Sequence, residues 1–310
     1  MILITGATGF IGRHLTRRLA REGWPVRCML RPGRGASRLA GGVSVEVVTA
    51  TVDDPPALRA AMLGVDTVIH LVGTKVERGD QTFEAINYRG TVNVLEAAQE
   101  AGVRRFIHLS YLGADRSSAY PFLRSKGQAD EAVRSSGMAY TILRPSIVYG
   151  PGDDFTTHLA MLIKVTPFVF PVLGDGRSRL QPIHVEDLAR CIEATLRDPT
   201  TVGQVIPLGG PQHLTYEEAL TTIMRVIGSR RVRLHVRRPL MQRWVEITGR
   251  FFARPLVTLA DLDLLAMDNI TDLVSVPRHF KFEPRRFADS LDYLRGQPWR
   301  RLFWRLLRAG

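Results

Sequence analysis

The stretch Met1-Ile2-Leu3-Ile4-Thr5-Gly6-Ala7-Thr8-Gly9-Phe10-Ile11-Gly12 opens the chain and decides its fold. Its first four residues are apolar and predict a short buried strand. Glycines follow at residues 6, 9 and 12, and an amphipathic helical pattern starts directly after this turn. A strand, a glycine turn and a helix in immediate succession form the context in which this glycine spacing indicates a dinucleotide-binding site.

Each glycine of the turn has its own physical role. Gly6 permits a sharp turn, Gly9 lets a pyrophosphate approach the backbone, and Gly12 lets helix and strand pack closely. The helix N-terminus then offers unpaired N–H groups to the phosphates. The alternative is a glycine-rich turn that binds no ligand. The cofactor contacts predicted from this stretch are Gly6, Thr8, Gly9, Phe10, Ile11 and Gly12.

Length and composition limit the classes of protein to consider. The chain has 310 residues, which suffices for one large domain or for one domain with a smaller appendage. It contains no run of about 18 apolar residues, so no membrane-spanning helix is predicted. Because the chain starts directly in a strand, we expect no signal or transit peptide. Cys28 and Cys191 form no metal-binding pattern, and a reducing, cytoplasmic location is the simplest expectation.

The formal net charge is +12, and nearly all of the cations are arginines. A positive charge of this size favours phosphate-bearing ligands and anionic surfaces. No nucleic-acid-reading motif accompanies it, so no nucleic-acid partner is expected. An arginine bias that merely reflects genome base composition would carry no function.

The residues after the second predicted strand discriminate between cofactors. An acidic residue there binds the ribose 2′-hydroxyl of NAD, whereas an arginine accommodates the 2′-phosphate of NADP. Arg31 occupies this position, Arg34, Ser37 and Arg38 follow closely, and no acid is near. The sequence therefore predicts NADP in preference to NAD. The alternative is a solvated basic loop.

Strands and helices alternate through the first half, which predicts an α/β fold with a doubly wound parallel sheet. Asp53 follows the third strand and is expected either to meet the adenine or to cap the next helix. Leu71, Val72 and Gly73 follow the fourth strand, and Ser110 follows the fifth, at the sheet edge where such folds bind ligands. The predicted strands span 1–4, 25–30, 43–49, 66–71, 104–109 and 139–143, and the helices include 82–101 and 121–135.

The regular alternation ends near residue 150. Prolines and glycines then interrupt the chain, and helical patterns return at 185–196 and 216–227. We expect residues 1–150 to form a Rossmann domain that binds NAD(P) and continues in part through 180–210. Residues 151–310 are expected to form a smaller C-terminal α/β lobe that serves a substrate or partner.

Several blocks together resemble the extended and atypical short-chain dehydrogenase/reductases, including the NAD-dependent epimerase/dehydratase family. They are the glycine turn, Asn87-Tyr88-Arg89-Gly90-Thr91, Leu143-Arg144-Pro145-Ser146-Ile147-Val148-Tyr149-Gly150 and Gln181-Pro182-Ile183-His184. The combination is most similar to the atypical branch, with a complex I accessory subunit and NmrA-like and isoflavone-reductase-like proteins. The resemblance implies a Rossmann fold and an NAD(P) cofactor. It also implies catalytic roles for Ser110 and Lys126, a ribose contact for Lys126, and positions beside the nicotinamide for Pro145, Ile147 and Val148.

The proton donor is the main departure from the resemblance. The family places a tyrosine four residues before the lysine, so that both side chains share one helix face. That tyrosine acts as general acid or base. Phe122 occupies the position here, and a phenyl ring cannot donate a proton. Tyr120 lies on another face, and Tyr111 is expected to point elsewhere. Lys126 is expected to keep its contact with the nicotinamide ribose.

These features leave three functions open. The first is an NADP(H)-dependent reductase of a small or lipophilic substrate, in which Ser110, Lys126 or water handles the proton. Reduction of an activated carbon–carbon double bond fits the missing tyrosine. The second is a non-catalytic protein that holds NADP(H) in a structural, assembly or redox-sensing role. The third, a sugar-nucleotide epimerase or dehydratase, is disfavoured by Phe122 and Arg31.

Other polar residues carry weaker signals. His184, Glu186 and Asp187 lack the spacing of a metal site, so no metal is predicted and these residues are expected to cap and orient a helix. His70 and His108 lie in strand patterns. We expect them in the core or at a sheet edge.

The C-terminus carries a basic amphipathic helix over residues 299–308. Such a helix lies at a membrane interface, packs on its own domain or contacts a partner protein. Residues 230–254 are also rich in arginine and offer a second basic surface. A peripheral membrane or protein-complex contact is therefore one of the expectations. A helical projection places Arg300, Arg301, Arg305 and Arg308 opposite Leu302, Phe303, Leu306 and Leu307.

Overall fold

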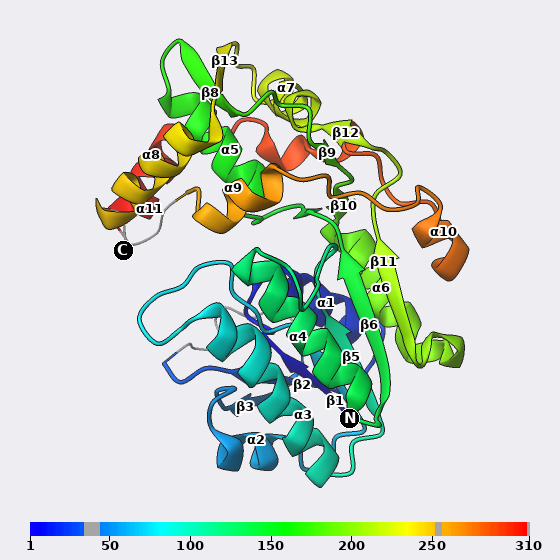
Figure 1. The fold of residues 1–310 in the computed structure, drawn as a ribbon. Coiled ribbons are helices and arrows are strands. Elements are labelled where there is room, and N and C mark those ends of the chain that lie inside the picture. The colour runs from blue at the N-terminus through cyan, green and yellow to red at the C-terminus, as the bar shows by residue number, and fades with distance from the viewer. Residues whose placement is uncertain (34–43, 252–255, 309–310) are drawn as a thin grey trace. The chain divides into compact units, whose positions relative to one another are not determined.

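A computed structural model describes residues 1–33, 44–251 and 256–308 of the chain (Figure 1). The chain divides into two compact units. The first comprises Met1–Pro145 and Val185–Leu208, and the second comprises Ser146–His184 and Gly209–Gly310. Three residues of the predicted basic loop, Arg34, Ser37 and Arg38, lie outside the described residues.

A seven-stranded parallel sheet forms the centre of the first unit, in the order β11-β6-β5-β4-β1-β2-β3. The order reverses between β1 and β4, and this is the position at which doubly wound sheets bind ligands. The predicted fold class is confirmed. The strands are β1 (Ile2–Thr5), β2 (Val26–Leu30), β3 (Glu46–Thr49), β4 (Thr67–His70), β5 (Arg105–Leu109), β6 (Ala139–Pro145) and β11 (Gln204–Leu208).

Helices cover both faces of this sheet (Figure 1). On one face α1 (Phe10–Arg21) packs against α6 (Val185–Arg197). On the other face α2 (Pro55–Ala61), α3 (Gly90–Glu100) and α4 (Pro121–Ser135) pack side by side. All four residues of β1 are buried, as expected for a central strand covered on both faces.

Two predicted elements differ from the structure in an informative way. The helix predicted over residues 82–101 begins as a π-helix, Glu84–Arg89, and continues as α3. A π-turn is uncommon and often marks a functional site. The third strand starts only at Glu46, because β3 is an edge strand whose side chains are mostly exposed and gain little from burial.

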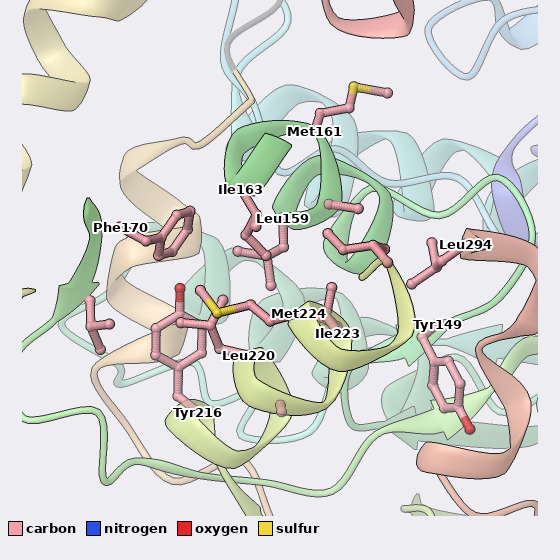
Figure 2. Close-up of a cluster of buried hydrophobic side chains, with 14 of the residues drawn as sticks. Tyr149, Leu159, Met161, Ile163, Phe170, Tyr216, Leu220, Ile223, Met224 and Leu294 are labelled. Carbon is pink, nitrogen blue, oxygen red and sulfur yellow. The ribbon is translucent and has the colours of Figure 1, made fainter. Parts of the chain in front are cut away.

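The second unit is built from helices and short strand pairs. Figure 2 shows its core, in which Leu220 and Ile223 of α7 (Tyr216–Val226) meet Leu159 of α5 (Phe155–Val165). The strand pairs are β7 (Val148–Tyr149) with β10 (Ile183–His184), β8 (Val169–Leu173) with β13 (Val232–Val236), and β9 (Arg179–Leu180) with β12 (Leu214–Thr215). The remaining helices are α8 (Arg238–Phe251), α9 (Leu259–Leu265), α10 (Ser275–Phe280) and α11 (Trp299–Arg308).

The C-terminal helix α11 packs on its own unit, against α5. Trp299 is buried in the core, and Leu302 and Phe303 pack against it. Leu302 and Phe303, from the apolar side of the helix, are therefore partly covered by protein, while Arg300, Arg301 and Trp304 remain exposed. Among the helices that the structure describes, none is long and apolar enough to cross a membrane.

Candidate active site

The glycine turn between β1 and α1 is closely packed at two of its three glycines. Gly6 has a backbone φ of +76°, which favours glycine, and an added Cβ would lie 3.0 Å from the carbonyl carbon of Leu71. At Gly12 an added Cβ would lie 2.2 Å from the carbonyl oxygen of Gly6. Gly12 is thus required for the close approach of helix and strand.

Gly9 is less crowded than Gly6 and Gly12, although an added Cβ there would make one tight backbone contact. Chain neighbours apart, an added Cβ at Gly9 would meet among the described residues just one atom within 4 Å, Gly6 O at 3.1 Å. Gly9 is exposed and is the N-cap residue of α1, and no described side chain caps this helix. The first N–H groups of α1, at Phe10, Ile11 and Gly12, therefore have no partner within their helix. Thr8 is half-buried in the turn.

This turn has the properties of a phosphate cradle. Uncapped N–H groups and the helix dipole attract an anion, and the open space beside Gly9 admits one. The first turn of α1 contains no acidic residue in the described structure, so nothing there repels a phosphate. The predicted residues therefore fit the pyrophosphate of a dinucleotide.

The neighbouring strand ends hold the next two candidates. Arg31 follows β2 directly and is exposed. Asp53 follows β3 and is also exposed, whereas Asp54 caps α2 by accepting a hydrogen bond of 3.1 Å from the Ala57 N–H. Of the two roles expected for Asp53, the helix cap is therefore wrong, because Asp54 caps α2.

Beyond β4, the chain passes close to Lys126. The Leu71 N–H donates to Thr5 O over 3.2 Å, which keeps the half-buried Leu71 and Val72 beside the glycine turn. At Gly73 an added Cβ would lie 3.1 Å from Lys126 Nζ and 3.4 Å from Asn87 Oδ1. A larger residue at 73 would displace both polar groups.

Asn87 fixes this loop in place. Its Oδ1 accepts from the Thr74 N–H at 2.8 Å, and its Nδ2 donates to Thr74 O at 3.1 Å and to Ser125 Oγ at 3.1 Å. Asn87 comes from the π-helix and Ser125 from α4, so one buried amide joins two helices to the loop after β4.

Lys126 is buried on α4, and its ammonium donates to Leu109 O at 3.1 Å. Burial lowers the pKa of Lys126 to about 8, although the charge of Asp130 opposes this shift. A group with a pKa near neutrality exchanges protons readily under physiological conditions. Its position beside Gly73 and Asn87 suits a contact with a ribose hydroxyl.

A buried polar network lies next to Lys126. His70 and His108 stack with ring centroids 5.5 Å apart, and both are fully buried. His108 Nε2 lies 3.5 Å from Asp130 Oδ1, and Arg144 binds Asp130 at 2.7 Å. Both histidines are in the core, one of the two places where we expected them. Their proximity to Lys126 was not predicted.

The hydrogen bonds of His70 define its tautomer. Thr91 Oγ1 donates to Asn87 O at 2.7 Å, so it accepts at 3.1 Å from His70 Nε2. His70 Nδ1 then accepts from Thr5 Oγ1 at 2.8 Å. The ring is neutral, in agreement with burial, which lowers the pKa of His70 to about 3 together with the charge of Lys126. Burial also lowers the pKa of His108 well below its usual value.

Ser110 belongs to this buried network and has little exposed surface. Ser110 is 5% exposed. Burial raises the pKa of the nearby Asp130, and Ser110 partly opposes this shift. Among the residues placed by the structure, its Oγ has no partner at hydrogen-bond length. Its N–H pairs with Leu143 O at 2.8 Å, so the strand ladder continues past β5.

The aromatic residues around Phe122 correct one expectation. Phe122 is buried one helical turn before Lys126, and its ring meets the ring of Tyr111 edge-on at a centroid distance of 5.4 Å. Phe83 packs on it in the same way at 5.9 Å. The expectation that Tyr111 points elsewhere is wrong, because the residue directly after the strand end packs toward α4. A phenol ring thus lies against Phe122.

The remaining predicted contacts fall in both units. Pro145 ends β6 in the first unit and its carbonyl accepts from the Leu112 N–H at 2.9 Å. Ile147 and Val148 belong to the second unit, where Ile147 is part of the core and Val148 opens β7. Pro145 therefore shares a unit with the glycine turn, whereas Ile147 and Val148 belong to the other unit.

Glu186 and His184, which we expected to orient a helix, each contact a polar side chain. Glu186, in the first turn of α6, binds His14 Nδ1 of α1 at 2.5 Å, so it joins the two helices of that face. His184 lies 3.3 Å from Arg285 through its Nδ1. Within the described part of the chain, no group of His, Cys, Asp and Glu side chains could hold a metal ion.

Comparison with known proteins agrees with this geometry. The model of the NAD dependent epimerase/dehydratase family matches residues 2–209. The match includes β1, the glycine turn, Lys126 and the last strand of the sheet.

Two curated relatives are similar over the same region. A ceramide reductase of Caulobacter vibrioides is 40% identical over 201 residues, which are 64% of this chain and 62% of the relative. The mitochondrial NADH dehydrogenase [ubiquinone] 1 alpha subcomplex subunit 9 of Arabidopsis thaliana is 34% identical over 222 residues, 69% of this chain and 55% of that protein. The matched region thus spans less than two thirds of either relative.

Solved structures share the fold. A nucleoside-diphosphate-sugar epimerase of Staphylococcus aureus superposes with a TM-score of 0.75 at 18% identity, covering 94% of this chain and 99% of that one. A dTDP-glucose 4,6-dehydratase of Streptomyces venezuelae, with NAD bound, gives a TM-score of 0.71 at 22% identity, covering 97% of each chain.

Proposed function

The chain belongs to the NAD dependent epimerase/dehydratase family and binds a nicotinamide dinucleotide. We propose that it is an NADP(H)-dependent reductase of a lipophilic carbonyl compound. The observation that carries the proposal is the buried Lys126, which lies against Gly73 at the sheet edge that also carries the glycine turn.

The order of the strands supports a single path for the cofactor. Arg31 follows β2, the glycine turn follows β1, Gly73 follows β4, and Ser110 with Tyr111 follows β5. These strands are neighbours in the order β2-β1-β4-β5, and their carboxyl ends lie along one edge. In the proposal Arg31 pairs with the 2′-phosphate, the α1 amides hold the pyrophosphate, and Lys126 binds the nicotinamide ribose.

Proton transfer is assigned to the residues around Phe122. When bound, the reduced nicotinamide supplies a hydride to the substrate carbonyl carbon. Tyr111 donates a proton to the carbonyl oxygen, because its phenol ring contacts the helix position where the family keeps its tyrosine. The Lys126 ammonium stabilises the resulting phenolate, and the buried Asp130 offsets part of the lysine's desolvation.

The lipophilic substrate is inferred from the relatives. The relative with 40% identity is described as a ceramide reductase, and ceramide is a long-chain lipid. Phe83, Phe122 and Tyr111 form an aromatic cluster at the helix that carries Lys126. In the proposal this apolar cluster favours an alkyl chain over a charged sugar nucleotide.

The test compares NADPH oxidation on three carbonyl substrates. They are the long-chain ketone that corresponds to the secondary alcohol of ceramide, a short-chain ketone with the same head, and a nucleotide sugar. We expect turnover of the long-chain ketone above both others. Turnover of the nucleotide sugar alone would contradict the proposal and favour epimerase or dehydratase chemistry.

A second candidate function has its own supporting observation. Phe122 replaces the usual proton donor, and one relative is a subunit of mitochondrial NADH dehydrogenase. A protein that only holds the cofactor in a complex would release it slowly. Tight retention of NADPH through purification, together with no turnover on the ketones above, would favour this second function.

A further inference from the structure

A basic groove lies on the second unit, apart from the residues assigned to the reductase. Its volume is about 570 Å³, within the usual range for ligand sites. It is lined by Lys164 at the end of α5, by the chain between α7 and β13, and by the first turn of α11. The residues are Lys164, Gly228, Ser229, Arg230, Arg231, Gln297, Pro298, Trp299, Arg300 and Arg301.

The groove is lined by several cationic side chains and by no acidic one among the described residues. Five of its residues are cationic, namely Lys164, Arg230, Arg231, Arg300 and Arg301, and no acid lines it in the part of the chain that the structure describes. Across residues 1–33, 44–251 and 256–308 none of these five forms an ion pair. Like charges held this close repel one another, so an anion in the groove would be bound favourably.

Backbone carbonyls accept hydrogen bonds from three of the five cationic side chains. Arg231 Nε donates to Thr166 O at 2.8 Å, and Arg300 Nε donates to Lys164 O at 3.2 Å. Lys164 Nζ lies 3.4 Å from Gly228 O. These contacts orient the side chains while leaving their charges available. The N-terminus of α11 adds the partial positive charge of its dipole.

Exposed apolar residues follow the groove-lining residues along the chain and on the paired strand. Phe168 is 81% exposed and Val232 is 68% exposed. Val232 follows the groove residue Arg231 in the chain, and its N–H donates to Phe168 O at 3.0 Å, so the backbones of these two exposed apolar residues adjoin. Trp304, one turn beyond Arg300 and Arg301 on α11, is 57% exposed.

We propose that this groove binds the phosphate headgroup of an anionic phospholipid and docks the second unit on a membrane surface, with Phe168 and Val232 entering the acyl boundary. A soluble phosphate would need the cations alone, whereas a lipid uses both the charge and the adjacent apolar residues. Stable membrane association takes two signals, and the groove combines basic and apolar ones. This inference does not depend on the reductase proposal.

The test is flotation of the full chain with vesicles of phosphatidylcholine alone or mixed with phosphatidylglycerol. We expect binding to the mixed vesicles only. Each cation near an anionic surface contributes about fivefold in affinity, so Arg230→Gln with Arg301→Gln should weaken binding by about 25-fold. The control, Arg21→Gln with Arg116→Gln, removes the same charge from exposed positions of the first unit and should weaken binding by less than about twofold.

Three outcomes would overturn the proposal. Equal loss in the two double variants would mean that diffuse charge drives binding. No binding to the mixed vesicles would exclude the lipid. A soluble anion would be indicated if inorganic phosphate at constant ionic strength released the protein from the vesicles and Phe168→Ser bound the vesicles as tightly as the wild type does. Phe168→Ser is expected to weaken vesicle binding. Circular dichroism and thermal unfolding of each variant report whether it is folded.

Discussion

At the scale of single residues, the candidate site differs from the family pattern described above at Phe122. Phe122 cannot donate a proton, yet Tyr111 packs against it and Lys126 lies one helical turn further along α4. In the proposed mechanism the phenol comes from Tyr111 at the end of β5. A motif defined by spacing along one helix cannot identify a residue from another element.

The role of Tyr111 is tested by moving the phenol. Tyr111→Phe should lower kcat by about 10²–10⁴-fold, the usual contribution of a general acid, while leaving the Kd for NADPH unchanged. Adding Phe122→Tyr to that variant places a phenol four residues before Lys126 and should restore part of the rate. Tyr120→Phe is the matched control. Full activity in Tyr111→Phe would remove Tyr111 from the mechanism.

Cofactor choice rests on Arg31. In Arg31→Ala the affinity for NADPH should fall by about 10-fold or more, because a charge-assisted contact contributes about 1.5–3 kcal/mol. The affinity for NADH should hardly change, and Arg21→Ala serves as a control for net charge. Fluorescence titration of both cofactors measures this. Similar Kd values for NADPH and NADH in the wild type would contradict the assignment.

At the scale of elements, the local sequence predicted the position of a helix or strand well where tertiary contacts did not alter it. The helix expected at 121–135 is observed at Pro121–Ser135, because proline suits the first helical position and the apolar face is regular. The π-helix at Glu84–Arg89 was not predicted, since nothing in its sequence distinguishes it from an α-helix. The histidine pair did leave a signal. Both β4 and β5 run into the tripeptide Ile-His-Leu, and parallel pairing in register places His70 beside His108.

The glycine turn offers a paired prediction. Gly9→Val should fold and lose NADPH binding, because its side chain would occupy the space beside the uncapped amides of α1. Gly12→Val should instead fail to fold or lose much stability, since its Cβ would lie 2.2 Å from Gly6 O. Circular dichroism and cofactor titration separate the two effects. A folded Gly9→Val that binds NADPH normally would show that the phosphates lie elsewhere.

At the scale of the whole molecule, the buried histidines link stability to pH. The pKa of His70 is about 3 in the folded protein and near 6.5 when unfolded, so below pH 6.5 only the unfolded chain takes up this proton. Stability is therefore fully present above pH 6.5 and is lost as the pH falls toward 3. The loss is about 1.4 kcal/mol per pH unit for each such group.

Urea unfolding between pH 6.5 and 5 measures this linkage. The wild type should lose about 1.6 kcal/mol more over this range than His70→Asn, which lacks the titrating ring. His213→Asn, at an exposed histidine, serves as the control for removal of an imidazole from the surface. Identical slopes for wild type and His70→Asn would mean that His70 is not a neutral buried group.

In the sequence, the boundary between the two units was visible only as the end of the regular strand–helix alternation near residue 150. The parallel sheet follows from alternating strands and helices, but the groove of the second unit joins residues 164, 228–231 and 297–301, which no local pattern connects. The amphipathic pattern of the C-terminal helix was visible. Which of its sides faces protein required the fold, because only tertiary packing covers Leu302 and Phe303.

Transfer of deuterium from NADPH labelled at the nicotinamide C4 tests the central claim most directly. The labelled cofactor is incubated with the protein and the long-chain ketone, and the lipid is analysed by mass spectrometry. The account predicts an alcohol that carries one deuterium on its carbinol carbon, and formation of this alcohol should be much slower in Lys126→Ala. Bound NADPH that keeps its label while the ketone is unchanged would contradict the claim and leave a protein that only holds its cofactor.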